Sequence, residues 1–257
     1  MRILSKKLGQ ACAGLAVALS LGVAAPAKAD VVQLGFILDS SGSIGSGNWN
    51  VIRQGLSDAI DLIPVSGTTQ YEVSVVTFGN TVSTPVANFL ITDVASRDTL
   101  SNQVAGLTFL NGSATNYAIA FSAMTTALST TIANASASYV NFATDGAQNQ
   151  GGTGIPERNA LIAAGVDNIS IEGIGSGVDA ADLQTNFCYP GPCDTTVPYN
   201  FPAQGFYIGV ANAAGYAGAI GNKVRIVTGQ VPEPQMIALL GIGLLGLTPL
   251  MRRRRQD

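Results

Sequence analysis

The chain of 257 residues contains no histidine. This absence excludes the Ser-His-Asp arrangement of serine hydrolases, in which histidine activates the nucleophile. A lysine could replace it only through Lys223, the one lysine between Asp30 and Gln230. Lys223 falls in a C-terminal helical segment, where we expect a structural role. We therefore expect a protein that is not an enzyme.

Cysteine is also scarce, because the chain has three cysteines and only two of them lie after residue 29. Cys188 and Cys193 flank the sequence Tyr-Pro-Gly-Pro. Such a turn can bring them within disulfide reach, and an oxidising compartment would keep the bond. A metal site on the two thiolates is the rival interpretation, but it would lack histidine partners. We expect a disulfide-closed loop.

Basic residues are few between Asp30 and Gln230. Five of them stand against fourteen acidic residues, a formal balance of −9. Nucleic-acid binding needs clustered Lys and Arg, so this composition argues against a nucleic-acid partner. The surface must instead be covered mainly by Ser, Thr, Asn, Gln and Gly, as is common for secreted bacterial proteins.

The first residues have the organisation of an export signal. Arg2, Lys6 and Lys7 precede an apolar run that ends in the small-residue sequence APAKA. A charged start, an apolar middle and an A-x-A-like cleavage site are the three parts of a signal peptide. We expect residues 1–29 to be removed on export, leaving an N-terminus near Asp30. A short transmembrane anchor fits less well because small residues close the segment.

The other end of the chain carries a second three-part pattern. It begins with a motif formed by Val231, Pro232, Glu233 and Pro234. An apolar run over 236–251 follows, and four arginines come after it. A run of this length can just cross a bilayer, and an arginine cluster after it stays on the cytoplasmic side. The main domain would then lie outside the membrane.

Residues 231–257 resemble the PEP-CTERM sorting signal of Gram-negative bacteria, in which these three parts are recognised by an exosortase. The resemblance covers about the last tenth of the chain. It implies processing at the inner membrane, where the C-terminal helix is a transient anchor. It also implies delivery to the periplasm, the outer cell surface or an exopolysaccharide-rich extracellular matrix. An ordinary C-terminal membrane anchor is the alternative.

Between these two ends, apolar β-branched runs alternate with amphipathic segments. The segment of about 200 residues is long enough for one domain with a substantial core. The alternation predicts an α/β fold, Rossmann-like and doubly wound, with a mainly parallel central sheet flanked by helices. Functional sites in such folds lie at the C-terminal ends of the strands. The expected strands are 31–38, 71–78, 138–143, 169–174 and 206–210, the expected helices are 48–63, 94–107, 117–128, 156–164 and 211–223, and 185–204 is expected to be a surface loop.

Oxygen-bearing side chains gather where these predicted strands end. They come from a D-x-S-x-S run after the first strand, from a turn-rich loop over 111–116 and from the end of the strand over 140–143. The candidate ligands are Asp39, Ser41, Ser43, Thr115 and Asp145. Hydroxyl and carboxylate oxygens suit hard divalent cations, so the set predicts a site for Mg²⁺, or for Mn²⁺ or Ca²⁺. The rival interpretation is a polar turn or helix cap.

The order and spacing of these segments resemble the von Willebrand factor type A domain and its metal-ion-dependent adhesion site. The resemblance spans about 31–227, within a domain that we place at 30–230. It implies an intact metal motif, in which the five residues are direct or water-mediated ligands. In that family an acidic side chain of the bound protein completes the coordination, so the metal bridges two proteins and is not a catalyst.

Three hypotheses about function follow. The first is an exported cell-surface or matrix protein that binds a protein partner through a divalent cation, in adhesion or protein–protein interaction. The second is a structural protein of an exopolysaccharide matrix, without metal-dependent recognition. The third is a metal-dependent hydrolase, for which no general base beside the ion is indicated.

Overall fold

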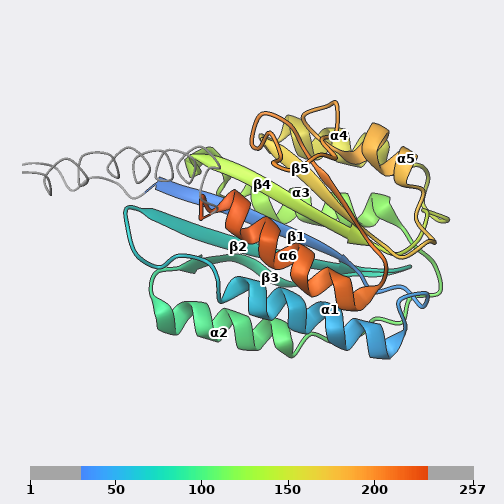
Figure 1. Cartoon of the computed structure of the whole chain (residues 1–257), viewed down its shortest axis with the longest axis horizontal. Coiled ribbons are helices and arrows are strands. Elements are labelled where there is room, and N and C mark those ends of the chain that lie inside the picture. The colour runs from blue at the N-terminus through green and yellow to red at the C-terminus, as the bar shows by residue number, and fades with distance from the viewer. Residues whose placement is uncertain (1–29, 231–257) are drawn as a thin grey trace, which may run out of the picture.

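Six strands form the central sheet (Figure 1). The computed structural model of the protein describes residues 30–230, so the predicted signal peptide and sorting signal lie outside the described residues. The strand order is β3-β2-β1-β4-β5-β6, and β2 and β3 alone are antiparallel neighbours within it. The strands are β1 (Asp30–Asp39), β2 (Thr69–Phe78), β3 (Val82–Ile91), β4 (Ala137–Thr144), β5 (Asn168–Ile174) and β6 (Tyr207–Val210).

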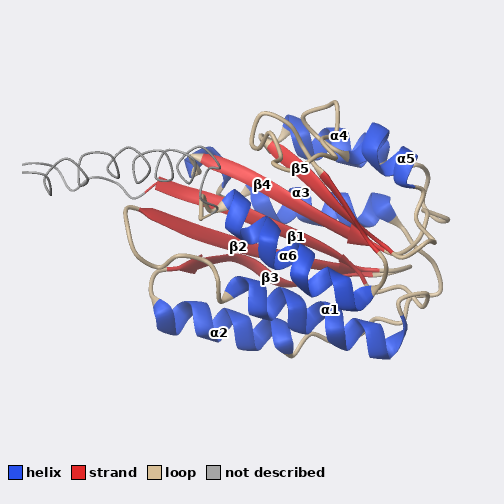
Figure 2. Ribbon diagram, in the orientation of Figure 1, coloured by secondary structure: helices blue, strands red, loops and turns tan. Residues whose placement is uncertain are grey.

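Helices cover both faces of this sheet, as Figure 2 shows. On one face α1 (Gly45–Ile60) packs between α2 (Val94–Ala105) and α6 (Ala213–Val227). The other face carries α3 (Tyr117–Ser129) and α4 (Ile155–Ala163). The short elements are η1 (Ile132–Asn134), α5 (Ala180–Asp182) and η2 (Leu183–Phe187). The predicted fold class is confirmed, and among residues 30–230 no helix is both long enough and apolar enough to span a bilayer.

Strand β1 lies at the centre of the sheet, between β2 and β4. Phe36 stands opposite Val75 of β2 and Asn141 of β4, and both pairings are parallel. From Leu34 onward the strand is buried, which agrees with its near-continuous apolar sequence. Because β1 and β4 run in the same direction, their C-terminal ends meet at one edge of the sheet.

The core on the α3 face is rich in aromatic side chains and centres on Phe142 of β4. Phe142 is fully buried. Its ring centroid lies 4.8 Å from that of Tyr117, 5.1 Å from Phe121 and 5.9 Å from Phe78. These side chains join β4 to β2 and to α3, so one strand position connects three elements.

The antiparallel strand β3 was not predicted. Its exposure alternates irregularly, and the pairing of β2 with β3 shifts register twice between Val73 and Thr77. Pro85 lies inside the strand, which a sheet edge tolerates because an edge strand leaves one side unpaired. The weak alternation and the proline together explain why no strand was predicted over 82–91.

The prediction of a surface loop over 185–204 is wrong for its first residues. Phe187 and Cys188 are buried in the core of the α3 face, with exposed fractions of 1% and 4%. Cys188 and Cys193 form a disulfide, with sulfur atoms 2.06 Å apart and Cα atoms 5.6 Å apart. Its content of Pro, Cys and Asn favoured a loop, but the stretch carries apolar side chains into the core at its start.

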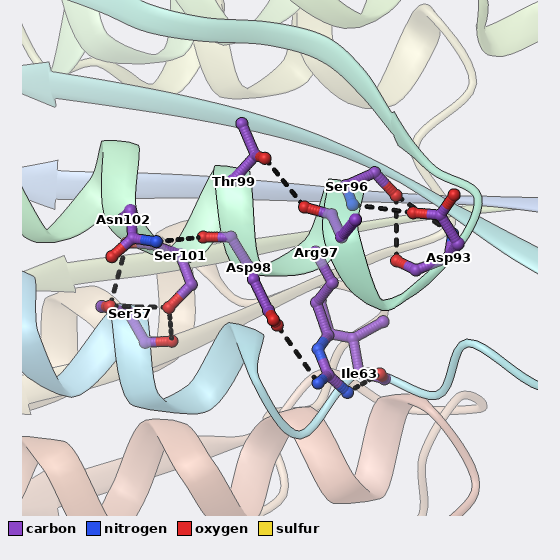
Figure 3. Close-up of polar contacts among 10 residues, drawn as sticks. Ser57, Ile63, Asp93, Ser96, Arg97, Asp98, Thr99, Ser101 and Asn102 are labelled. Carbon is purple, nitrogen blue, oxygen red and sulfur yellow. Dashed lines mark hydrogen bonds and ion pairs between the residues drawn. The ribbon is translucent and has the colours of Figure 1, made fainter.

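Helices α1 and α2 are joined by a buried pair of serines (Figure 3). Ser57 donates to the Ser101 carbonyl oxygen at 2.9 Å, Ser101 donates to the Ser57 carbonyl oxygen at 3.1 Å, and the two hydroxyl oxygens are 2.9 Å apart. Both side chains are buried, with exposed fractions of 3% and 7%. Small hydroxyl side chains thus let the two helices approach closely and still satisfy their polar groups.

Replacing Ser57 with alanine is expected to lower the free energy of unfolding by about 1–2 kcal/mol, because it leaves the buried Ser101 hydroxyl with one partner fewer. Urea denaturation measures this loss. Ser46→Ala, on the exposed side of the same helix, is the matched control and should change the stability by less than about 0.5 kcal/mol. Equal effects of the two substitutions would contradict the importance of the serine pair.

Candidate metal centre

The candidate site lies at the C-terminal edge of the sheet, where β1 and β4 end side by side. Asp39 is the last residue of β1, and Asp145 directly follows β4. The chain moves from β1 to β2 on one side and reaches β4 on the other, so this edge is a topological switch point of the sheet. Ligands in open α/β sheets bind at such points.

Asp39 is the innermost residue of the site, and its exposed fraction is 1%. Its Oδ1 accepts the backbone N–H of Ser41 at 2.8 Å, and its Oδ2 accepts the hydroxyl of Thr144 at 2.6 Å. Burial raises the pKa of Asp39 to about 6, against the opposing effect of these hydrogen bonds. The negative charge of Asp145 adds to the rise. A bound cation would remove the cost of ionising this carboxylate.

A chain of hydrogen bonds runs from Asp39 toward the protein surface. The hydroxyl oxygens of Ser41 and Ser43 lie 2.9 Å apart. Ser43 donates to Asp145 Oδ1 at 2.8 Å. Asp145 is half-buried, and burial raises its pKa as well. Four of the five predicted ligands therefore form one connected set.

Thr115 borders the same small space from the loop before α3. Its side chain is buried, with an exposed fraction of 4%. A methyl group placed on Gly146 would lie 3.8 Å from Thr115 Oγ1 and 3.9 Å from Ser43 Oγ, so the two hydroxyls face a common point. Asn149 holds the Thr115 backbone through two hydrogen bonds of 2.9 and 3.0 Å. The structure thus brings all five predicted residues to one place.

Backbone pairing holds the two ligand loops together. Gly42 N–H donates to the Gly112 carbonyl at 2.6 Å, and Gly112 N–H donates to the Ser40 carbonyl at 3.3 Å. A side chain on Gly112 would lie 2.7 Å from the backbone nitrogen of Asn80 and 2.8 Å from Gly79 Cα. Only glycine allows this approach. It sets how closely the loop that carries Thr115 approaches the loop after β2.

Sequence reasoning missed several residues that support the site. Thr144 fixes Asp39, and Tyr117 donates its hydroxyl to the Gly146 carbonyl at 2.5 Å. Gln148 Oε1 accepts the N–H of Tyr117 at 3.1 Å, which ties the loop after Asp145 to α3. Thr144 could have been found, since it is a hydroxyl residue between a predicted strand and the candidate ligand Asp145.

The set of side chains fits a hard divalent cation. It offers two carboxylates and three hydroxyls, which are the oxygen ligands that Mg²⁺, Mn²⁺ and Ca²⁺ accept. Within residues 30–230 no group of three or more His, Cys, Asp or Glu side chains could hold a metal by itself. Any cation at this edge would therefore depend on the hydroxyls of Ser41, Ser43 and Thr115.

The sequence matches two known families over different parts of the chain. Residues 33–202 match the von Willebrand factor type A domain, and residues 230–255 match the PEP-CTERM protein-sorting motif. The chain belongs to the von Willebrand factor type A domain family. The sorting motif indicates an exported protein. No curated protein matches this sequence.

Solved structures support the same fold. The structure of proximal thread matrix protein 1 from the mussel byssus, with a zinc-occupied MIDAS motif, has a TM-score of 0.61 and 17% identity over 78% of this chain and 49% of that one. A von Willebrand factor type A structure from Catenulispora acidiphila has a TM-score of 0.59 and 18% identity over 78% of this chain and 43% of that one. This chain thus spans half or less of those structures. At these identities the likeness shows the fold.

Proposed function

We propose that this exported protein binds a protein partner at the cell surface or in an extracellular matrix, through a divalent cation at its von Willebrand factor type A domain. The cation would be held by Asp39, Ser41, Ser43, Thr115 and Asp145. The observation that carries the proposal is the hydrogen-bonded chain from Asp39 through the two serines to Asp145. It supports a set of oxygen ligands that is assembled before any cation arrives.

The exposure of these residues supports recognition at the outer side of the site. Asp39 and Ser41 are buried, whereas Ser43 is exposed and Asp145 is half-exposed. The inner carboxylate would hold the cation, and Ser43 would form part of the accessible rim. The bound cation supplies the positive charge that attracts an acidic side chain of the partner. The residues of this site then bind and orient, and no bond needs to be broken.

Mg²⁺ is the proposed ion, with Mn²⁺ or Ca²⁺ as alternatives, because all five ligands are oxygen atoms. The zinc-occupied site of the mussel protein adds zinc to the ions worth testing. The proposal also includes three processing steps. Residues 1–29 are removed, the apolar helix that follows the motif anchors the protein transiently, and an exosortase recognises the motif Val231, Pro232, Glu233 and Pro234. They rest on the sequence pattern and on the match to the sorting motif.

A structural role in an exopolysaccharide matrix is the second candidate. The sorting motif favours it, because that motif is typical of proteins delivered to such a matrix, and a structural role needs no cation. The hydrolase hypothesis has no such support: the two carboxylates at the site, Asp39 and Asp145, are both proposed as ligands of the cation.

Chelation separates the two candidates. The protein, purified from its outer-surface fraction, is incubated with washed cells or matrix in a buffer with Mg²⁺ or with excess EDTA, and the retained fraction is measured. We expect retention to be lost with EDTA and restored by added Mg²⁺. Equal retention in both conditions would support the structural role and contradict cation-dependent binding.

Protons are expected to compete with the cation. Burial raises the pKa of Asp39 to about 6, and a cation needs the ionised carboxylate. Above pH 7 the affinity for Mg²⁺ should therefore be constant, and below pH 6 it should fall about tenfold for each pH unit. Calorimetric titrations of Mg²⁺ at about pH 5, 6 and 7.5, which lie below, at and above the pKa of Asp39, measure this change. A constant affinity over the whole range would contradict Asp39 as a ligand.

A further inference from the structure

Three polar side chains meet inside the apolar layer between α6 and the sheet, where Asn141 precedes Asp145 of the candidate metal centre by four residues. They are Lys223 of α6, Glu172 of β5 and Asn141 of β4, with exposed fractions of 2%, 0% and 4%. Lys223 Nζ lies 2.5 Å from Asn141 Oδ1 and 2.5 Å from Glu172 Oε1. The amine of Lys223 therefore contacts both the amide of Asn141 and the carboxyl group of Glu172.

Aromatic side chains enclose this cluster. Lys223 Nζ lies 5.0 Å from the centre of the Phe206 ring, and Tyr199 stacks on that ring at 4.4 Å. Tyr216 of α6 is fully buried, and the charge of Glu172 is one of the causes that raise its pKa. Such surroundings have a low dielectric constant, in which charged groups are costly.

Burial acts on both ionisable members of the cluster. It raises the pKa of Glu172 and lowers the pKa of Lys223, and their mutual attraction opposes both changes. Proton transfer from the ammonium to the carboxylate would give a neutral amine beside a neutral acid. A neutral amine is a nucleophile, whereas an ammonium is not.

A simple ion pair leaves part of the cluster unexplained. Among residues 30–230, Asn141 Nδ2 and Glu172 Oε2 make no hydrogen bond of ordinary geometry, although the Asn141 side chain is close enough to Glu172 to lower the pKa of that carboxyl group. Buried polar atoms without partners are rare, because each loses its hydration without compensation. The unpartnered atoms are the amide nitrogen, which is a possible leaving group, and a carboxyl oxygen, which can carry a proton.

We propose that an intramolecular isopeptide bond joins Lys223 to Asn141 in the folded protein, with Glu172 as the catalytic acid and base. This site is separate from the candidate metal centre and does not depend on the proposed function.

The reaction balances without a cofactor. Lys223 Nζ, as the neutral amine, attacks Asn141 Cγ, and the protonated Glu172 polarises the amide oxygen. The Nζ–Cγ bond forms, the Cγ–Nδ2 bond breaks, and Glu172 moves one amine proton to the leaving nitrogen. The products are a secondary amide and ammonia, so nothing is oxidised or reduced. The protein becomes lighter by one ammonia, about 17 Da.

The geometry suits this attack. A C=O bond is about 1.23 Å long, so Nζ lies at most about 3.7 Å from Asn141 Cγ, close to the roughly 3–3.5 Å of reactive contacts. A cavity of about 20 Å³ adjoins the cluster and is lined by Asn141 and Lys223. It is large enough for one water-sized molecule. Ammonia has that size, so the leaving group has somewhere to go.

The bond would join the central strand β4 to the last helix of the described residues across 82 positions of the chain. The match to the sorting motif begins at residue 230, three residues after the last residue of this helix. A pulling force applied at the C-terminal side would then pass from α6 into the centre of the sheet. Without the bond, the same force would first peel α6 from the domain.

Peptide mapping tests the proposal on protein purified from cells that produce the full chain. Trypsin cuts after Lys and Arg, so Asn141 falls in the peptide 98–158 and an unmodified Lys223 ends the peptide 159–223. We expect one branched species that contains 98–158 and 159–225, uncut at Lys223 and lighter than the two peptides together by about 17 Da. Separate 98–158 and 159–223 peptides of unmodified mass would overturn the proposal.

Two variants test the roles of the residues. Glu172→Gln keeps both reacting side chains and removes the proton carrier, so it should give the separate peptides. A branched species that persists in Glu172→Gln would overturn the catalytic role of Glu172. Asn141→Ala removes the amide carbon and must also give separate peptides, and a branched species in this variant would place the link elsewhere. The wild-type map is decisive even if neither variant folds.

Discussion

Asp145→Ala is expected to weaken the binding of Mg²⁺ by about 100-fold or more. The substitution removes one of the two carboxylates of the set, and loss of residues that merely support metal ligands already costs about 10–100-fold in other proteins. It also removes the acceptor of the Ser43 hydroxyl. Calorimetric titration of Mg²⁺ into the wild type and the variant measures the difference.

Asp58→Ala is the matched control, since Asp58 is an exposed acidic residue on α1. It changes the net charge equally and should leave the affinity unchanged. A similar loss of affinity in both variants would mean that overall charge, and not the site, binds the cation. Unchanged affinity in Asp145→Ala would remove Asp145 from the ligand set.

The burial of the Asp39 carboxylate also affects the stability of the metal-free protein. Burial raises the pKa of Asp39, so in the absence of a cation ionisation of this group costs stability at pH values above about 6. Asp39→Asn removes that charge and keeps the size of the side chain. We therefore expect lost Mg²⁺ binding together with a metal-free stability at pH 7 no lower than that of the wild type. A strongly destabilised variant would show that Asp39 is mainly a structural residue.

Phe142→Ala is expected to have the largest effect on stability, a loss of about 3–5 kcal/mol. The ring is fully buried and contacts aromatic side chains of β2, α3 and η2, among them Phe187 at 6.0 Å between centroids. Its removal leaves a cavity that three rigid elements cannot close. Urea denaturation followed by circular dichroism measures the loss.

Phe142→Leu is the control for this prediction. It keeps most of the apolar volume and should cost clearly less than the alanine variant. A loss of less than about 1 kcal/mol for Phe142→Ala would mean that the surrounding side chains collapse into the space. The aromatic core would then not be the rigid support of β4 and of Asp145 at its end.

Much of the fold could be predicted because its strands are buried on both faces. The five predicted strands and five predicted helices correspond to observed elements, with ends displaced by a few residues. Parallel strands between two helix layers need apolar side chains on both sides, so β1 and β4 are evident in the sequence. Strand β3 is only partly buried, and its Pro85 and irregular alternation gave no comparable pattern.

Four of the five candidate ligands could be predicted because they lie at or shortly after strand ends, and Thr144 could have been found in the same way. Gln148 and Asn149 could not, because they act through contacts that depend on the loop after β4. Gly112 is required by a close backbone approach that no local pattern records. These contacts depend on the packing of segments that are distant in the sequence, which local sequence patterns do not predict.

The cluster of Lys223, Glu172 and Asn141 illustrates the same limit. The sequence indicated that Lys223 is a structural residue of a helix, but nothing local relates it to a strand residue 82 positions away. Asn141 and Glu172 lie on neighbouring strands, two positions apart in the pairing of β4 with β5, and therefore share one face of the sheet. Only the packing of α6 on that face brings the amine between them.

Anomalous diffraction from crystals grown with Mn²⁺ tests the metal site most directly, because manganese scatters anomalously and replaces Mg²⁺ at oxygen sites. We expect one strong peak at the C-terminal edge of the sheet, within about 2.5 Å of the hydroxyl oxygens of Ser41 and Ser43. Asp39, Thr115 and Asp145 should surround the same peak directly or through water. A peak only at another position, or an unchanged Ser43–Asp145 hydrogen bond with no peak beside it, would contradict the account.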